Sequence, residues 1–182
     1  MASGSTARAF RAAAMPTRRL MLTPLRSEDA GPMAMALSDV RLHEFIGGTP
    51  ASPAELTARY RRMVAGSGDP GEIWLNWIVR LRESSEPVGT VQATLTRQDG
   101  RWAAAVAWTV GVPWQGRGYA AEAADALVTW LISQGAAVVT ANIHPDHHAS
   151  AAVAMRAGLA PTSDQVDGER VWRREPDNPL AG

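Results

Sequence analysis

The stretch Gln115-Gly116-Arg117-Gly118-Tyr119-Ala120 marks the point where the hydrophobic pattern of the chain changes. Before it, residues 72–81, 88–96 and 101–110 have strand-like composition and are separated by turn residues, which predicts an antiparallel meander. After it, apolar residues recur at helical spacing as far as Gly135, a residue type that commonly ends helices. A strand, a glycine-rich loop and a helix in this order form an anion site, because glycines admit a phosphate and the N–H groups of the first helical turn lack partners.

The sequence on both sides of this stretch predicts elements of both kinds. The capping box Ser52-Pro53-Ala54-Glu55 marks the start of one helix. The further predicted elements are a strand at 17–25, helices at 27–37 and 52–65, an apolar strand at 136–143, a helix at 149–157 and a final strand at 170–174. We expect the strand at 136–143 to be buried on both faces. The predicted fold class is therefore mixed α+β, with a meander that leads into a βαβ unit.

The composition indicates one ordinary globular unit. The chain has 182 residues, 46% hydrophobic and 20% charged, and its formal net charge is zero. A neutral chain has no overall field that attracts nucleic acid, and no apolar run approaches the roughly 20 residues of a membrane helix. We expect a single domain at 16–176, a disordered extension at 1–15 and a tail at 177–182. The extension is rich in Ala, Ser and Arg, so a transit-like peptide is the alternative.

Two residue types are absent from the chain, and their absence excludes several chemistries. Without cysteine there are no disulfides, thiolate nucleophiles or cysteine-ligated metals, which is consistent with the reducing cytoplasm, where we place the protein. Without lysine there is no Schiff base and no P-loop, so phosphates must be bound by backbone N–H groups and arginine. A dinucleotide fingerprint is disfavoured because Ala121 follows the glycines and the loop comes late, after an antiparallel meander.

The Q-x-x-G-x-A pattern of Gln115, Gly118 and Ala120 resembles the acetyl-CoA signature of the GCN5-related N-acetyltransferases (GNAT). The preceding strand, the following helix and the later run Arg156-Ala157-Gly158-Leu159 are also similar to this family. The opening at 17–25 resembles the branch that acetylates ribosomal-protein N-termini. The resemblance covers about 17–174. It implies a mostly antiparallel, twisted sheet of six to seven strands, splayed between strands 4 and 5 and flanked by about four helices.

The resemblance implies an acetyl-CoA-dependent N-acetyltransferase whose acceptor is a primary amine, either a small molecule or a peptide N-terminus. The thioester is expected between the splayed strands, where the amine attacks it directly and a tetrahedral intermediate forms. The backbone of the preceding strand would bind the pantetheine arm, and the loop would bind the pyrophosphate. The cofactor-binding residues implied in this way are Val110, Val112, Gln115, Gly116, Arg117, Gly118, Tyr119 and Ala120.

The catalytic residues match the family pattern less completely. His147 stands where the family usually has asparagine, and it can donate to the pantetheine or act as a base, because histidine titrates near neutrality. A plain surface histidine is the alternative. Ala154 replaces the tyrosine that some members use as an acid, so Ser150 is the remaining hydroxyl, with helix capping as its alternative role. Residues 103–108 contain no carboxylate, so the base must come from elsewhere or be replaced by water.

No metal site is predicted. His144, His147 and His148 have metal-like spacing, but Pro145 breaks the helix that would align them. The family also suggests that the region with His43 and Tyr60 forms one wall of an acceptor pocket.

Three functional classes stay open at this point. The first is an active acetyltransferase, which includes an antibiotic-modifying enzyme that acts on a small amine. The second is a non-catalytic CoA-binding module, suggested by the missing tyrosine and glutamate. The third is a nucleotide-binding protein of another class. We expect neither nucleic acid nor membrane as a partner, and a homodimer is the expectation because dimers are common among soluble oligomers.

Overall fold

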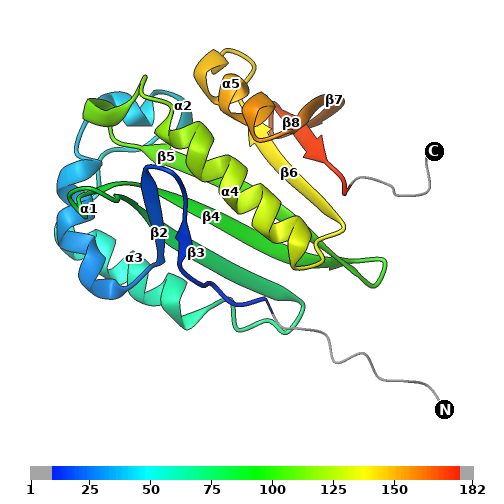
Figure 1. Ribbon diagram of the computed structural model, residues 1–182, viewed down its shortest axis with the longest axis horizontal. Helices are drawn as coiled ribbons and strands as arrows, with labels where there is room; N and C mark the ends of the chain where they lie inside the picture. Colours follow the sequence, from blue (N-terminus) through cyan, green and yellow to red (C-terminus); the bar gives the residue numbers. More distant parts are fainter. Residues whose placement is uncertain (1–9, 177–182) are drawn as a thin grey trace.

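The computed structural model describes residues 10–176, except for the side chain of Ile46. Its centre is one sheet of eight strands in the order β1-β2-β3-β4-β5-β6-β8-β7, and the pair β5–β6 is parallel (Figure 1). The strands are β1 (Met15–Pro16), β2 (Leu20–Pro24), β3 (Glu72–Leu81), β4 (Pro87–Gln98), β5 (Arg101–Val110), β6 (Val138–Ile143), β7 (Ala160–Val166) and β8 (Glu169–Arg174). The other neighbouring pairs are antiparallel, so the mostly antiparallel α+β fold expected from the sequence is confirmed.

Five α-helices and three short 3-10 turns connect the strands in the described part of the chain. The helices are α1 (Ala30–Ala36), α2 (His43–Ile46), α3 (Pro53–Ala65), α4 (Tyr119–Ser133) and α5 (His148–Arg156), and the turns are η1 (Ser27–Asp29), η2 (Val40–Leu42) and η3 (Val112–Trp114). The sequence indicated six to seven strands and about four helices. The additional elements are the two-residue β1 and the four-residue α2, which are too short to produce a hydrophobic period. No helix within residues 10–176 is long and apolar enough to cross a membrane.

The described part of the N-terminal region packs against the sheet. Phe10 and Met15 are buried, and the indole Nε1 of Trp77 donates to the carbonyl of Ala13 at 2.8 Å. Phe10 also meets Trp102 edge to face, with 6.1 Å between the ring centroids. The expected extension at 1–15 is therefore not separate from the sheet at residues 10–15, because its apolar side chains find partners there. The remaining expectations, an extension at 1–9 and a tail at 177–182, lie outside the described residues.

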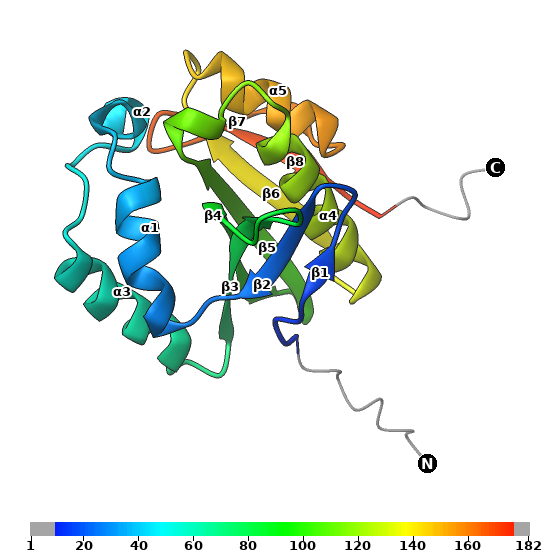
Figure 2. The same ribbon diagram turned by 60° about the vertical axis from the view of Figure 1, so that its left-hand side comes forward.

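The two faces of the sheet are covered by different helices. Figure 2 shows α1 and α3 on one side of the strands and α4 on the other. Trp77 and Ile78 are neighbours on β3 and point to opposite faces, as strand geometry requires. Trp77 is buried in the larger core with Leu127 of α4, and Ile78 is buried in a smaller core with Met33 of α1. Helices α1 and α3 thus cover one face of the sheet, and α4 covers the other.

One sequence expectation about β6 is wrong. The strand at 136–143 was expected to be buried on both faces, but burial alternates along β6. Val139, Ala141 and Ile143 are buried, whereas Asn142 is exposed. The physical reason is that α1 and α3 do not extend over this part of the sheet (Figure 2).

The parallel pair β5–β6 separates at one end. Its pairing covers only Ala103–Ala105 against Val138–Thr140. Beyond that point β5 continues to Val110 beside β4, while β6 continues beside β8. The expected splay between the fourth and fifth strands of the family fold is therefore confirmed as a gap between β5 and β6. The gap opens at the end of β5 that leads into the glycine-rich loop.

Candidate active site

The glycine-rich loop is already shaped for an anion. Gly116 and Gly118 have φ values of +72° and +78°, a left-handed conformation that favours glycine. Gly118 caps α4, and its carbonyl accepts the first helical hydrogen bond, from the N–H of Glu122 at 3.0 Å. The N–H groups of the first turn therefore lack intrahelical acceptors and point out of the helix end. This arrangement matches what a pyrophosphate requires.

The strand that precedes the loop directs polar backbone groups into the gap. The N–H of Gly111 donates to Val88 of β4 at 2.8 Å. Because polar groups alternate along an antiparallel strand, the N–H and carbonyl of Val110 point away from β4, and the amide of Gln115 donates to that carbonyl at 3.0 Å. Val112 differs from expectation, since β5 ends at Val110 and Val112 begins η3, where its carbonyl accepts from the N–H of Gln115. Only Val110 thus keeps the strand geometry expected for both residues.

A segment distant in sequence fastens the loop and α4. The Oγ1 of Thr17 donates to Glu122 at 2.6 Å, and the backbone N–H and Nε of Arg19 donate to the same carboxylate at 2.7 Å each. The Nη1 of Arg19 donates to the carbonyl of Arg117 at 2.9 Å, and its guanidinium lies 4.7 Å from the ring centre of Tyr119. We call Thr17, Arg19 and Glu122 the loop clamp. It attaches the segment before β2 to the first turn of α4.

The clamp also controls the charge beside the loop. Burial raises the pKa of the Glu122 carboxyl, but the hydrogen bonds from Thr17 and Arg19 outweigh burial and lower it overall. Glu122 is therefore ionised, and the guanidinium of Arg19 neutralises it at 2.7 Å. Without that cation, a carboxylate in the first turn would repel an anionic ligand. Sequence reasoning missed this pair, although an acid in the first turn of an anion-binding helix is a signal that a counter-charge is needed.

His147 caps helix α5. Its Nδ1 accepts from the backbone N–H of Ser150 at 3.4 Å, so the ring proton of the neutral form is on Nε2. The ring stacks on Phe45 of α2, with 4.2 Å between centroids and 13° between planes. Burial lowers the pKa of His147, the Glu44 carboxylate opposes this, and His144 adds to it. A neutral ring whose free nitrogen carries a proton is suited to donate a hydrogen bond, and of its two expected roles the donor is the favoured one.

Ser150 does not cap helix α5, which was the alternative role expected for it. It is the third residue of α5, and the cap is His147, so its hydroxyl is not used for capping. The Oγ instead accepts from the indole Nε1 of Trp108 at 3.1 Å. Trp108 lies on the part of β5 that no longer pairs with β6. The hydrogen bond therefore spans the gap and holds the hydroxyl there.

Tyr60 and His43, which the sequence also singled out, lie on helices α3 and α2. The side chain of Tyr60 is buried between α3 and the sheet. Burial raises its pKa to about 12, and its hydroxyl has no hydrogen-bond partner within the described residues. The Nδ1 of His43 lies 2.9 Å from the carbonyl of Gly47 in its own turn. Within residues 10–176, no group of three or more His, Asp or Glu is placed to hold a metal ion.

The face of the sheet opposite α4 is open beside the gap. Ala105 and Ala107 of β5 are exposed on this face, and Gln92 of β4, which pairs with Ala107, is exposed beside them. We call these three residues the acceptor floor. It has no charged side chain, and it presents small methyl groups and one amide. Ala105 and Ala107 alternate with Trp108 along β5, so they lie on the face opposite the indole that bonds to Ser150.

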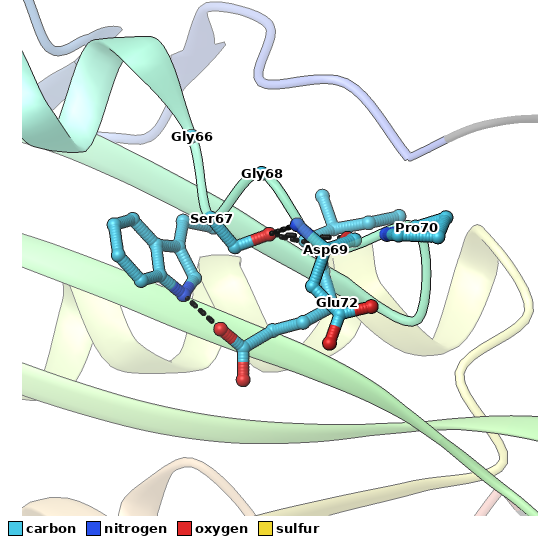
Figure 3. Close-up of a pocket in the computed structure, with 8 residues that line it drawn as sticks. Gly66, Ser67, Gly68, Asp69, Pro70 and Glu72 are labelled. Atoms are coloured by element: carbon cyan, nitrogen blue, oxygen red, sulfur yellow. Dashed lines mark hydrogen bonds between the residues drawn. The ribbon is translucent and has the colours of Figure 1, made fainter.

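A separate hollow of about 430 Å³ lies between the end of α3 and the start of β3 (Figure 3). Its polar groups already bond to one another. The Oγ of Ser67 donates to the carbonyl of Glu72 at 2.7 Å, and the indole of Trp74 donates to the Glu72 carboxylate at 2.6 Å. The N–H of Gly71 donates to Asp69 at 2.7 Å. The residues around the hollow form the connection between α3 and β3, which is closed by its own hydrogen bonds. They are distant in sequence from the glycine-rich loop and from the start of α5.

Comparisons with known proteins agree with this geometry. The family model described as an acetyltransferase (GNAT) domain matches residues 19–160. No curated protein matches the chain. RimL, a ribosomal alpha-N-protein acetyltransferase solved in complex with coenzyme A, is 15% identical with a TM-score of 0.74, and the alignment covers 91% of this chain and 99% of that one.

Two further solved structures are similar in the same way. An acetyltransferase from Agrobacterium tumefaciens is 26% identical, with a TM-score of 0.69 and coverage of 92% of this chain and 96% of that one. The aminoglycoside acetyltransferase AAC(6')-Ib, solved with coenzyme A, is 15% identical, with a TM-score of 0.69 and coverage of 86% and 94%. The neighbours at 15% identity show a shared fold, and the family match extends over most of the chain. The chain therefore belongs to the GNAT family of acetyltransferases.

Proposed function

We propose that this protein transfers the acetyl group of acetyl-CoA to a primary amine and that the loop at 115–120 holds the CoA. The observation that carries the proposal is the loop itself. Gly116 and Gly118 are left-handed, the end of α4 offers unpaired N–H groups, and both lie beside a gap in the sheet. GNAT proteins of similar fold have been solved with coenzyme A, which supports the assignment.

The residues from the loop back to the end of β5 would bind successive parts of CoA. The N–H groups from Gly116 to Ala120 would hold the pyrophosphate, and Arg117, which is exposed beside them, would add positive charge. The backbone of Val110 would pair with the pantetheine arm as an added strand would. The loop clamp fixes the position of α4 before any ligand arrives, so little ordering is needed upon binding.

In the chemical step, Ser150 is the group we assign to the leaving sulfur. The amine nitrogen attacks the thioester carbon, the C–S bond breaks, and its electron pair goes to sulfur, which Ser150 stabilises by donating a hydrogen bond. The Nε2–H of His147 is available as a second donor near the same end of α5. The proton released by the amine goes to water, because residues 101–110 of β5 contain only Arg101 as a charged side chain and no carboxylate.

The acceptor floor supports an approach to the thioester along a surface without charged side chains. Ala105 and Ala107 leave room for a chain, and the Gln92 amide can both donate to it and accept from it. A peptide N-terminus or a small polar amine fits these groups. An antibiotic of the aminoglycoside type, which carries several positive charges, finds no counter-charge on the floor. The similarity to AAC(6')-Ib, at 15% identity, concerns the fold and adds little support for an aminoglycoside acceptor.

A non-catalytic CoA-binding module is the second candidate. It is favoured by the two departures from the family pattern, the absence of a carboxylate on β5 and Ala154 in place of the tyrosine. Such a module would bind acetyl-CoA as tightly as an enzyme does and would not release CoA faster in the presence of amines.

One experiment separates these functions. Acetyl-CoA is mixed with a panel of peptide N-termini, polyamines and aminoglycosides, and free thiol is measured, while calorimetry measures CoA binding. An enzyme shows thiol release with at least one amine, and Ser150→Ala lowers kcat by about 10- to 100-fold with CoA affinity unchanged. Binding without thiol release for every amine identifies the module. Absence of CoA binding contradicts both.

A further inference from the structure

The indole of Trp108 has a partner that sets it apart from other tryptophans of the sheet. Trp74 donates to Glu72, two residues away on the same strand, and Trp77 donates to a backbone carbonyl. Trp108 donates instead to the side chain of Ser150, 42 residues away and on a helix across the gap. Both residues are half-buried, so the bond is partly shielded from water.

We infer that Trp108 is a positioning residue for Ser150, which it fixes as a hydrogen-bond donor toward the CoA sulfur. The inference rests on the proposed function, because it assigns a supporting residue to the serine named there. The positioning role of Trp108 does not follow from the assignment of Ser150 alone. The direction of the serine hydroxyl is set by a residue on the opposite side of the gap.

The chemistry of the two groups fixes this direction. An indole N–H can donate and cannot accept, so the Oγ of Ser150 must be the acceptor in the 3.1 Å bond. The hydroxyl hydrogen is then turned away from the indole and is free for another acceptor. A hydroxyl that accepts one bond is also a stronger donor, by about 10–30% per bond in condensed-phase estimates. One lone pair of the serine is occupied, which favours the acid role over the base role.

The backbone of Ser150 is held independently. Its N–H donates to Nδ1 of His147, so the residue is fixed at the main chain by the helix cap and at the side chain by Trp108. The indole itself packs against the larger core beneath α4. Rotation of the hydroxyl away from the gap therefore requires the indole bond to break, which is how a residue in the core controls a group in the site.

Trp108→Phe tests the inference, because it removes the N–H and keeps an aromatic ring in the core. Trp102→Phe is the matched control, since Trp102 lies on the same strand and also packs against the larger core, at the end of β5 far from the gap. Two properties are measured in wild type, Trp108→Phe, Ser150→Ala and the double variant. They are the ultraviolet absorbance of the thiolate of bound CoA and kcat with an amine found in the panel.

Trp108→Phe is expected to lower the thiolate fraction of bound CoA about threefold and kcat about fivefold, with CoA affinity within twofold of wild type. In the Ser150→Ala background it should have no further effect, because the residue it positions is gone. Trp102→Phe should leave both properties unchanged. Equal losses in the presence and absence of Ser150, or an unchanged thiolate fraction, overturn the inference. Failure of CoA to bind to wild type overturns the proposed function and this inference with it.

Discussion

The two sides of the gap between β5 and β6 are held in different ways. On the loop side, Glu122 accepts three hydrogen bonds of 2.6–2.7 Å from Thr17 and Arg19, and Arg19 reaches the loop carbonyl of Arg117 at 2.9 Å. On the α5 side, Ser150 is held by one indole bond of 3.1 Å and by the cap bond of 3.4 Å from its N–H to the neutral ring of His147.

The difference in hydrogen-bond strength indicates a different task for each side of the gap. Hydrogen bonds to ionised groups are shorter and roughly twice as strong as neutral ones. The loop side is therefore rigid, as a preformed anion site must be, and we expect substitutions there to affect CoA affinity. The α5 side is held by weaker, directional bonds that orient two side chains, and we expect substitutions there to affect turnover or local stability with little change in CoA affinity.

The largest effect is expected for Gly118→Trp. The residue has a φ of +78°, and its side chain would begin 3.3 Å from the Nη2 of Arg19 and extend into the space assigned to the pyrophosphate. The Kd for CoA should rise by more than about 100-fold, a loss of roughly 2.7 kcal/mol, in calorimetric titration. Gly100→Trp is the control, because Gly100 has the same φ of +78° in open space in the β4–β5 turn. Unaltered CoA affinity in the Gly118 variant would contradict the loop assignment.

The loop clamp is tested by Arg19→Ala. This change removes the cation beside the Glu122 carboxylate, which keeps only its hydrogen bonds from Thr17 and from the backbone N–H of residue 19. The uncompensated negative charge in the first turn of α4 then repels the phosphates. We expect the Kd for CoA to rise about tenfold, roughly 1.4 kcal/mol. Adding Glu122→Gln removes the negative charge, so the double variant should bind CoA better than Arg19→Ala alone. Arg41→Ala, which breaks an exposed ion pair with Asp39, is the control and should have no effect. Equal affinities of the single and double variants would show that the charge of Glu122 does not reach the ligand.

The α5 side is tested by His147→Ala and His147→Asn. Alanine removes the cap of α5, and the midpoint of thermal unfolding should fall by an amount equivalent to about 0.5–1 kcal/mol, at the low end for a cap because the bond is 3.4 Å long. Asparagine is itself a good cap and should retain most of the stability. CoA affinity should fall only about two- to fivefold with alanine, the loss expected for one neutral hydrogen bond to the pantetheine, and less with asparagine, which can donate in its place. Both losses are smaller than those expected on the loop side.

The same histidine gives a pH test. Its pKa in the folded protein lies below the ordinary value of 6.5, so the unfolded chain takes up the proton first as the pH falls. This residue therefore costs no stability well above pH 6.5 and destabilises the fold as the pH drops through about 6.5 toward 5. His147→Asn should lose less stability than wild type between about pH 7 and pH 5, measured by urea unfolding. Parallel pH profiles would mean that the ring is not held neutral.

The smallest effect is expected at Tyr60 of α3. Its buried hydroxyl lacks a partner within the described residues, so Tyr60→Phe removes a polar group that the fold does not satisfy. We expect unfolding free energy to stay equal or to rise by less than about 1 kcal/mol, with CoA affinity unchanged. A clear destabilisation would show that the hydroxyl has a partner, such as a bound water.

Much of the fold follows from local sequence patterns. The strands at 72–81 and 101–110 match β3 and β5 residue for residue, because turn residues delimit each of them. The burial of β6 and the packing of residues 10–15 were not predicted, since both depend on which helices and rings lie nearby. The sequence also named Ser150 but assigned its alternative role wrongly, because the cap is His147.

The sequence by itself determined the loop at 115–120, the order of strands and helices around it, and the absence of lysine and cysteine chemistry. These are local properties, because glycine conformation and hydrophobic period depend on adjacent residues. The tertiary structure alone decided the two supports of the site. Arg19 meets Glu122 across 103 residues, and Trp108 meets Ser150 across 42. No short-range pattern encodes such pairs, because the sheet and its splay bring them together only when the chain has folded.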